Sequence, residues 1–354
     1  MKLIKYFLFL ILLAIIGGAI YFGTKNAKFD ISETKFINAP AEVIYDQVKD
    51  FKNWQNWGPW FQIDPNIQIS QSEESEGEGA TYAWKSKHEA LGSISLETKK
   101  VIPLKEIHQE ISIETMLSIS KSEVYWRFEE TEKKGQTKVT WGLKGDPSFL
   151  EKILLSFREH DIRTGVEILF PIGLSNIDTL VLDEINKFVI NVDGITNYDG
   201  GFYMYITNAS KISEIDSKLS EMLEQVSTFV DENKLETTGM PFTIYNEIDE
   251  MNATAIYSTG IPVDNQVITP PRSTVLCGFM PQLIALKTTL KGKYDYLELA
   301  YDAANEYLST NNLQEDPTRK KFEVYTNNHS LVANPAEWLT EIYIPIISLS
   351  NPQE

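Results

Sequence analysis

Two glutamates, each followed by a tyrosine two residues later, are the residues in this sequence best suited to chemistry. Glu323 precedes Tyr325 in the segment Phe-Glu-Val-Tyr, and Glu341 precedes Tyr343 in the segment Glu-Ile-Tyr-Ile. A carboxylate can neutralise a cation or accept a proton, and the face of a tyrosine ring attracts cations. The pattern therefore predicts a site for a cationic small molecule.

Both segments alternate apolar and polar residues, which is typical of half-buried strands. Turn-forming residues between them, such as Asn334 and Pro335, indicate adjacent antiparallel strands joined by a long loop. Because successive side chains point to opposite faces, we expect the aliphatic side of each strand to cover a core. The Glu/Tyr side is then free to line a ligand site. The alternative is that both glutamates face solvent, the commonest position of glutamate in a strand.

An internal repeat extends this pattern to an earlier part of the chain. Two further strand candidates contain a tyrosine in a similar setting: Tyr245 in Thr-Ile-Tyr and Tyr257 in Ala-Ile-Tyr. The segment Gly-Ile-Pro-Val at 260–263 is also similar to Tyr-Ile-Pro-Ile at 343–346. Each strand pair is preceded by a helical segment, at 212–230 and at 294–308. We interpret this as a duplicated β-α-β-β unit with a ligand cleft between its halves. The predicted ligand-binding residues are Glu323, Tyr325, Tyr245, Tyr257, Glu341 and Tyr343.

The second half of the chain resembles the GyrI-like (AraC effector-binding-like) domains over residues 197–348. The resemblance is carried by three segments, at 287–301, 322–325 and 340–346. It implies a cleft for amphipathic, often cationic, small molecules, in which the glutamate of the Glu-x-Tyr strand is the ligand carboxylate. That glutamate matches Glu323. The family often has His-x-Gly-Pro-Tyr before its second helix, whereas this sequence reads Leu-Lys-Gly-Lys-Tyr at 290–294, so a role that needs this histidine is not expected.

Motifs of other catalytic classes are missing from the sequence. It contains no G-x-S-x-G, Walker or G-x-G-x-x-G motif, and its histidines at 88, 108, 160 and 329 lack metal-binding spacing. We therefore predict a binding or sensing protein with no metal, no cofactor and no assigned catalytic residue. One alternative is a hydrolase acting on a reactive small molecule, with Glu323 as general base. A third interpretation is an envelope scaffold with vestigial pockets.

Length and charge limit the remaining possibilities. The 354 residues suffice for about two domains, and the net charge of −18 argues against a nucleic-acid partner, which needs clustered lysine and arginine. The only cysteine, Cys277, lies in an apolar strand context, where it is expected to fill core space.

The amino-terminal segment is apolar. Residues 6–22 carry no charge and span about 26 Å as a helix, slightly less than the ~30 Å hydrocarbon core. We predict that residues 1–27 form a single-pass membrane anchor, with the soluble domains exported to the periplasmic side. The alternative is a cleavable signal peptide, with Gly17 and Ala19 as small residues before the cut, but the apolar run continues beyond them.

Residues 28–190 read as an α+β domain. A strand at 29–37 is followed by a helix that we expect to start at an Asn38 cap, with Pro40 in its first turn, and to end near Lys49. Six further strands are expected at 67–73, 81–86, 92–102, 106–113, 123–130 and 137–143. A final helix is predicted at 175–189, after a stretch broken at Pro171 and Gly173.

This domain resembles the SRPBCC (polyketide cyclase/START-like) superfamily. The resemblance is carried by three segments, at 37–43, 50–60 and 136–141. It implies a helix-grip fold with a hydrophobic cavity between the sheet and the terminal helix. We expect Trp54, Trp57 and Trp60 to be packing residues, the alternative being the mouth of that cavity. With the duplicated GyrI-like domain at 197–350, the predicted class is α+β throughout.

Overall fold

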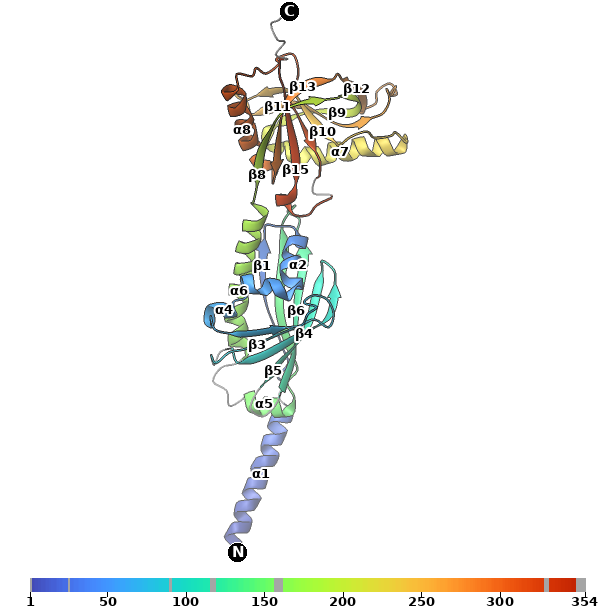
Figure 1. The fold of residues 1–354 in the computed structure, drawn as a ribbon. Coiled ribbons are helices and arrows are strands. Elements are labelled where there is room, and N and C mark those ends of the chain that lie inside the picture. Colours follow the sequence, from blue (N-terminus) through green and yellow to red (C-terminus); the bar gives the residue numbers. More distant parts are fainter. Residues whose placement is uncertain are drawn as a thin grey trace, which may run out of the picture. The chain divides into compact units, whose positions relative to one another are not determined.

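The computed structural model describes residues 2–24, 26–88, 91–114, 119–155, 162–327 and 331–347 (Figure 1). The chain divides into two compact units, Met1–Asp183 and Glu184–Glu354. Each unit contains one antiparallel sheet with helices. This mixed architecture agrees with the predicted α+β class.

The first unit holds a seven-stranded sheet in the order β1-β7-β6-β5-β4-β3-β2. Consecutive strands pair with each other, except that β1 closes onto β7. The alternation in the sequence predicted all seven strands; β6 starts four residues before its predicted start. Their bounds are β1 Phe29–Ile37, β2 Gln68–Gln71, β3 Thr81–Lys85, β4 Ser93–Ile102, β5 Glu106–Glu114, β6 Ile119–Glu130 and β7 Thr137–Gly145.

Helices precede, interrupt and follow this sheet. Among the described residues, α1 and α6 are both long and apolar enough to cross a membrane by length and composition, and one third of the α6 window is buried. The bounds are α1 Lys2–Thr24, α2 Ala41–Lys49, η1 Phe51–Asn53, α3 Trp54–Trp57, α4 Trp60–Ile63, α5 Phe149–Leu155 and α6 Ile162–Ile185.

The terminal helix of this unit differs from its prediction. It starts at Ile162 and continues through Pro171, where a break was expected, and it ends before Val189. Proline costs a helix one hydrogen bond, but packing offsets this cost. Phe170 stacks on Trp141 at 3.9 Å. A Cβ on Gly173 would lie 2.6 Å from a ring carbon of Trp141, so glycine lets the helix approach the sheet.

The start of α2 also differs from its prediction. Pro40 is the N-cap residue, and no side chain caps the helix. The Asn38 side-chain oxygen instead accepts hydrogen bonds from Gln136 Nε2 at 2.8 Å and from Lys133 Nζ at 3.1 Å. The expected Asn38 cap is therefore wrong, because the side chain is engaged by the turn before β7.

The tryptophans after α2 are core residues. Trp54, Trp57 and Trp60 are at most 2% exposed. Trp60 stacks on Trp84 at 4.8 Å, and Trp57 meets Trp141 edge-on at 5.8 Å. The packing interpretation is confirmed, since none of the three forms a rim open to solvent.

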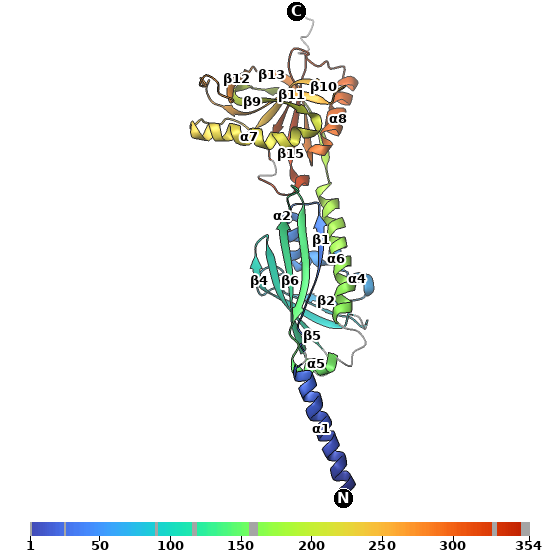
Figure 2. The same cartoon turned by 180° about the vertical axis from the view of Figure 1, so that it is seen from behind.

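The second unit holds an eight-stranded sheet in the order β12-β9-β11-β10-β14-β15-β13-β8. Two helices cover one face: α7 packs on β9 and β11, and α8 on β8 and β13 (Figure 2). The bounds are β8 Val189–Tyr198, β9 Gly201–Lys211, η2 Ile212–Glu214, α7 Ile215–Glu232, β10 Phe242–Asp249, β11 Thr254–Val263, β12 Leu276–Met280, β13 Leu283–Lys291, η3 Tyr294–Tyr296, α8 Leu297–Thr310, β14 Phe322–Tyr325, η4 Pro335–Glu337 and β15 Leu339–Pro345.

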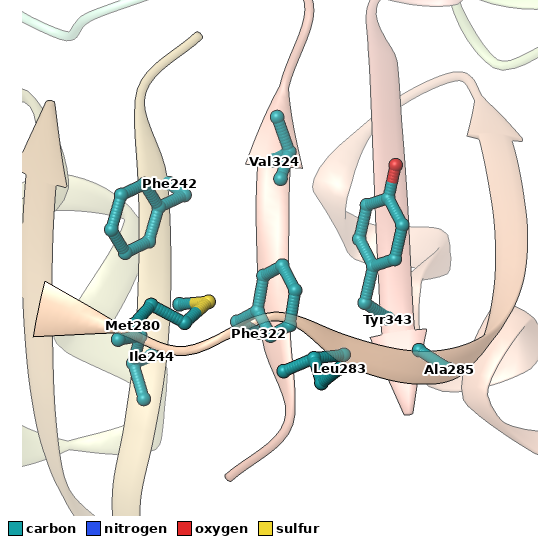
Figure 3. Close-up of a cluster of buried hydrophobic side chains, with 8 residues drawn as sticks. All are labelled: Phe242, Ile244, Met280, Leu283, Ala285, Phe322, Val324 and Tyr343. Carbon is teal, nitrogen blue, oxygen red and sulfur yellow. The ribbon is translucent and has the colours of Figure 1, made fainter. Parts of the chain in front are cut away.

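The outer strands of this sheet form one bent ribbon. Strands β8 and β9 follow each other directly, as do β12 and β13, and β8 pairs with β13 while β9 pairs with β12. At the bend, a Cβ on Gly200, whose φ is +69°, would lie 2.1 Å from the Met280 carbonyl oxygen, so only glycine fits there. Figure 3 shows the segment with Met280, Leu283 and Ala285, where β12 leads into β13, running across a buried cluster. The cluster lies on the face of the sheet opposite Ile342, which packs beneath α8. The cluster consists of Phe242, Ile244, Met280, Leu283, Ala285, Phe322, Val324 and Tyr343.

Candidate functional site

The register between β14 and β15 places the two predicted glutamates on opposite faces of the sheet. Glu323 lies opposite Ile342, which packs beneath α8, whereas Glu341 lies opposite Val324, on the other face. Directly opposed residues share a face in an antiparallel pair. The expected common site for both Glu/Tyr pairs is therefore wrong. The alternation within each strand does not show which faces of two paired strands coincide, because shifting the register by one residue moves every side chain of one strand to the other face of the sheet.

Glu323 is buried beneath three tyrosine hydroxyls. Its side chain lies on the helix-covered face, and the residue is 1% exposed. Its Oε1 accepts a hydrogen bond from Tyr301 at 2.9 Å, and its Oε2 accepts from Tyr325 at 3.0 Å and from Tyr245 at 3.2 Å. The solvent-facing alternative is wrong for this glutamate.

Three separate elements bring these hydroxyls together. Tyr325 lies two residues after Glu323 on the same face of β14. Strand β10 pairs with β14 so that Thr243 lies opposite Glu323, and Tyr245 is two residues further on the same face. Tyr301 belongs to α8, and its hydroxyl reaches Glu323 from the helix side of the sheet.

Sequence reasoning missed Tyr301. The sequence feature that could have identified Tyr301 is its spacing of seven residues from Tyr294, which places both side chains on one face of a helical segment. Tyr294 meets the Tyr325 ring at 5.6 Å and the Trp338 ring at 5.1 Å. Together these rings extend the aromatic surroundings of Glu323 toward η4.

Burial governs the electrostatics of the site. Desolvation raises the pKa of the Glu323 carboxyl, while the hydrogen bonds from the three tyrosines act in the opposite direction. Burial and the charge of Glu323 raise the pKa of Tyr245, Tyr301 and Tyr325, so these hydroxyls remain protonated donors. Within the described part of the chain, no lysine, arginine or histidine forms an ion pair with Glu323.

A pocket of about 740 Å³ adjoins this carboxylate. Its floor contains Glu323, Tyr325 and Tyr245, and its walls come from the starts of α7 and α8 and from the segment before β14. Apolar wall residues include Ile215, Leu219, Ile248 and Leu297. Charged wall residues are mainly acidic: Glu247, Glu250, Asp295, Glu298 and Glu315, with Arg319, Lys320 and Lys321 on one side. The arrangement suits a ligand with both apolar surface and positive charge.

Tyr257 lies beside this pocket without lining it. It is fully buried opposite Tyr245 on β11 and packs against Met222 of α7. Its hydroxyl shares a hydrogen bond of 3.3 Å with Ser210 Oγ. The structure therefore places Tyr257 as a support for Tyr245.

Glu341 and Tyr343 lie away from the pocket, on the opposite face of the sheet. Lys287 Nζ forms a 2.7 Å ion pair with Glu341 Oε1, and the Tyr343 hydroxyl donates to Oε2 at 2.7 Å. The Tyr343 ring stacks on Phe322 at 4.9 Å. Because Lys287 neutralises its charge, Glu341 is a structural ion-pair partner in this geometry.

Other residues singled out by the sequence lie elsewhere. His108, on β5, is bracketed by Glu106 at 2.9 Å and Glu123 at 2.8 Å. His160 and His329 lie outside the described residues. Cys277 is partly buried against the core beneath α7, as expected for a core residue.

Two family models match the chain, one in each unit. Residues 28–180 match the family described as polyketide cyclase / dehydrase and lipid transport. Residues 204–347 match the GyrI-like small molecule binding domain. Both resemblances inferred from the sequence motifs are thus confirmed, in the predicted order.

Several solved structures match parts of the chain at low identity. The crystal structure of the EcmrR C-terminal domain matches with 17% identity and a TM-score of 0.40, over 46% of this chain and 99% of that one. The EcmrR–DNA complex matches with 18% identity and a TM-score of 0.39, over 56% and 77%. The Aha1 dimer from Colwellia psychrerythraea matches with 17% identity and a TM-score of 0.32, over 43% and 96%.

No curated protein sequence matches the chain. The two family models cover separate halves, and both families bind small molecules. The chain therefore consists of an SRPBCC-like, polyketide cyclase-type domain followed by a GyrI-like small-molecule-binding domain.

Proposed function

We propose that this protein binds or senses an amphipathic, cationic small molecule in the pocket of its GyrI-like domain, with Glu323 as the charge partner. The observation that carries this proposal is a buried carboxylate held by three tyrosine hydroxyls, with no cationic partner among the described residues.

Such a carboxylate is electrostatically incomplete. Removing a charge from water is costly unless an opposite charge or hydrogen bonds compensate. Three neutral hydroxyls supply hydrogen bonds but no positive charge. A cation in the pocket supplies it, and the faces of the surrounding tyrosine rings attract the same cation. The apolar walls contributed by Ile215 and Leu297 favour a hydrophobic body on the ligand.

The strand order supports the proposed duplication of a β-α-β-β unit. The sets β9-α7-β10-β11 and β13-α8-β14-β15 meet where β10 pairs with β14. Thr243 in the first set occupies the position of Glu323 in the second, and Tyr245 that of Tyr325. Only the second set therefore places a carboxylate at this position of the central strand pair.

Membrane attachment is part of this proposal. Helix α1 has an apolar window at Ile4–Tyr21 in which Lys5 is the single charged residue and no described side chain is buried, which supports a single-pass anchor. We propose an anchor at 1–27, an SRPBCC-like domain at 28–190 and a GyrI-like domain at 197–350, with both domains exported to the periplasmic side. Ligand capture would then occur next to a membrane.

The test compares Glu323→Gln with Glu341→Gln in the purified chain. The probes are an aryl quaternary ammonium ion and its uncharged carbon isostere, with affinity measured by calorimetry. We expect Glu323→Gln to weaken binding of the cation by about 1–3 kcal/mol, the range for a charge-assisted contact, and to affect the isostere less. Glu341→Gln should change neither affinity appreciably. Equal cation affinity for wild type and Glu323→Gln would remove Glu323 from the site.

The raised pKa of Glu323 favours one second candidate function. A carboxylate with a raised pKa is a stronger base, so Glu323 could activate water against a reactive, electrophilic ligand. Turnover of an electrophile panel by wild type, lost in Glu323→Gln, would support this hydrolase. Binding without turnover would leave the binding protein as the function.

A further inference from the structure

The end of the SRPBCC-like domain that follows α1 carries exposed apolar and basic side chains. The tether to α1 is short: α1 ends at Thr24 and β1 begins at Phe29. A fully extended chain covers at most ~3.6 Å per residue, so Phe29 lies within about 18 Å of the end of α1. If α1 spans a bilayer, this end of the domain is confined near the lipid headgroups.

The sheet register shows which residues share that end with Phe29. Phe29 pairs with Gly145 at the end of β7, and Asp30 pairs with Lys144. Lys144 in turn lies opposite Glu123, so the start of β6 projects beyond this edge to Ile119.

Helix α5, which follows β7, belongs to the same end. Ser148 and Glu151 cap its first turn reciprocally: the Ser148 backbone N–H donates to Glu151 Oε2 at 2.6 Å, and the Glu151 N–H donates to Ser148 Oγ at 3.4 Å. The Glu151 carboxylate also accepts a hydrogen bond from Ser120 of β6, which ties the helix to the start of that strand. Helix α5 lies against α1.

Apolar side chains on these elements point into solvent. Ile119 is 62% exposed and Phe149 is 45% exposed. Beside them stand three exposed lysines, Lys28, Lys121 and Lys144, in a chain whose overall charge is strongly negative. Asp146, Glu110 and Glu123 hold these lysines in ion pairs at the surface, which are weak and can be exchanged for other anions. Lys144 also lies over the Tyr125 ring, 5.7 Å from its centroid.

We propose that this end of the domain is a membrane contact. Ile119 and Phe149 insert among the lipid headgroups, and Lys28, Lys121 and Lys144 face anionic lipid phosphates. The partner is the bilayer that holds α1, and the inference rests on the proposed anchor. Apolar side chains flanked by lysines beside a spanning helix are typical of interfacial contacts. Such a contact would fix the orientation of the domain on the membrane.

The experiment measures the depth of single fluorescent labels in the full-length chain. Cys277→Ser removes the native thiol. A cysteine is then introduced by Ile119→Cys, Phe149→Cys, Leu104→Cys or Leu10→Cys and labelled with an environment-sensitive dye. Leu104 is the matched control, since it is 42% exposed in the turn at the opposite end of β5. Leu10 reports on α1 itself. The protein is reconstituted in phosphatidylcholine vesicles with about one-third phosphatidylglycerol and brominated acyl chains.

We expect strong quenching of the labels at 119 and 149, at least twofold above that at 104, and a decrease when phosphatidylglycerol is omitted. Quenching at 119 and 149 no greater than at 104, with strong quenching at 10, would overturn the contact and leave the anchor intact; a protein partner at this end would give that result. No quenching at 10 would overturn the anchor and the contact together. Quenching unchanged without phosphatidylglycerol would overturn the role assigned to the lysines.

Discussion

The Tyr301 hydroxyl donates a 2.9 Å hydrogen bond to Glu323 Oε1 and thereby connects α8 to the centre of the sheet. Since Tyr325 and Tyr245 share the other carboxylate oxygen, Tyr301 is the one tyrosine bonded to Oε1. The protonation state of Glu323 therefore depends on a helix that also forms a wall of the pocket.

Replacing Tyr301 with phenylalanine removes this donor and keeps the ring. The hydrogen bond lowers the pKa of Glu323, so its loss should raise that pKa further. The acid limit of cation binding should then move to higher pH. Calorimetric titrations across pH measure the shift. Tyr307→Phe on the same helix is the control, and an identical profile for both variants would contradict the assigned role.

Glu323 should also make folding stability depend on pH. Its pKa is raised in the folded protein, so folding favours the protonated form. This contribution is fully present below the unfolded pKa of about 4.3 and is lost as pH rises through the folded value. The melting temperature of wild type should therefore fall relative to Glu323→Gln between acid and neutral pH. Other carboxylates also make stability depend on pH; for example, the hydrogen bond from His108 lowers the pKa of Glu106. Their contribution is the same in both proteins, so it cancels in the difference. A constant difference across pH would show that Glu323 is not buried as a charge.

Two glycines of α6 should respond oppositely to substitution by alanine. At Gly173 a Cβ would lie 2.6 Å from Trp141, so Gly173→Ala should destabilise the domain by about 1–3 kcal/mol through overpacking. At Gly165 nothing lies within 4 Å, and Gly165→Ala should stabilise the helix by about 0.5–1 kcal/mol. Denaturant unfolding measures both values. Equal effects would show that α6 does not approach Trp141 closely.

The proposed anchor makes a prediction about fractionation. Full-length protein should stay with membranes in a carbonate wash, because α1 is long and apolar enough to span the hydrocarbon core. A chain starting at Lys28 should be released into the soluble fraction. Release of the full-length protein by carbonate would contradict the anchor, and so would an amino terminus beginning after Ala19.

The sequence was most informative where one physical rule decided the outcome. Alternation predicted the seven strands of the first sheet, because the burial of one face imposes a period of two. Helix α6 was predicted too short, because Pro171 reads as a helix breaker until the contact between Phe170 and Trp141 is known. Tertiary packing decided that case.

The candidate site was predicted in part. Glu323, Tyr325 and Tyr245 do converge, as expected for a cleft formed by two halves of the domain. Glu341 does not join them, because register depends on pairing across a long loop, on which alternation within a strand carries no information. Tyr301 was overlooked because its role requires knowing where α8 crosses the sheet.

The bent ribbon formed by the outer strands of the second sheet limits how the pocket can admit a ligand. The edge strand β8 leads directly into β9, and the other edge strand, β12, leads directly into β13. The chain therefore connects the two outer edges of the sheet on the face opposite the pocket. Spreading α7 away from α8 would compress the buried cluster that includes Phe242 and Phe322, and close-packed cores resist compression. We therefore expect the sheet to keep its curvature and not to open about a hinge between its two halves. Entry and exit of the ligand must be accommodated by local shifts at the starts of α7 and α8, with the sheet held at fixed curvature.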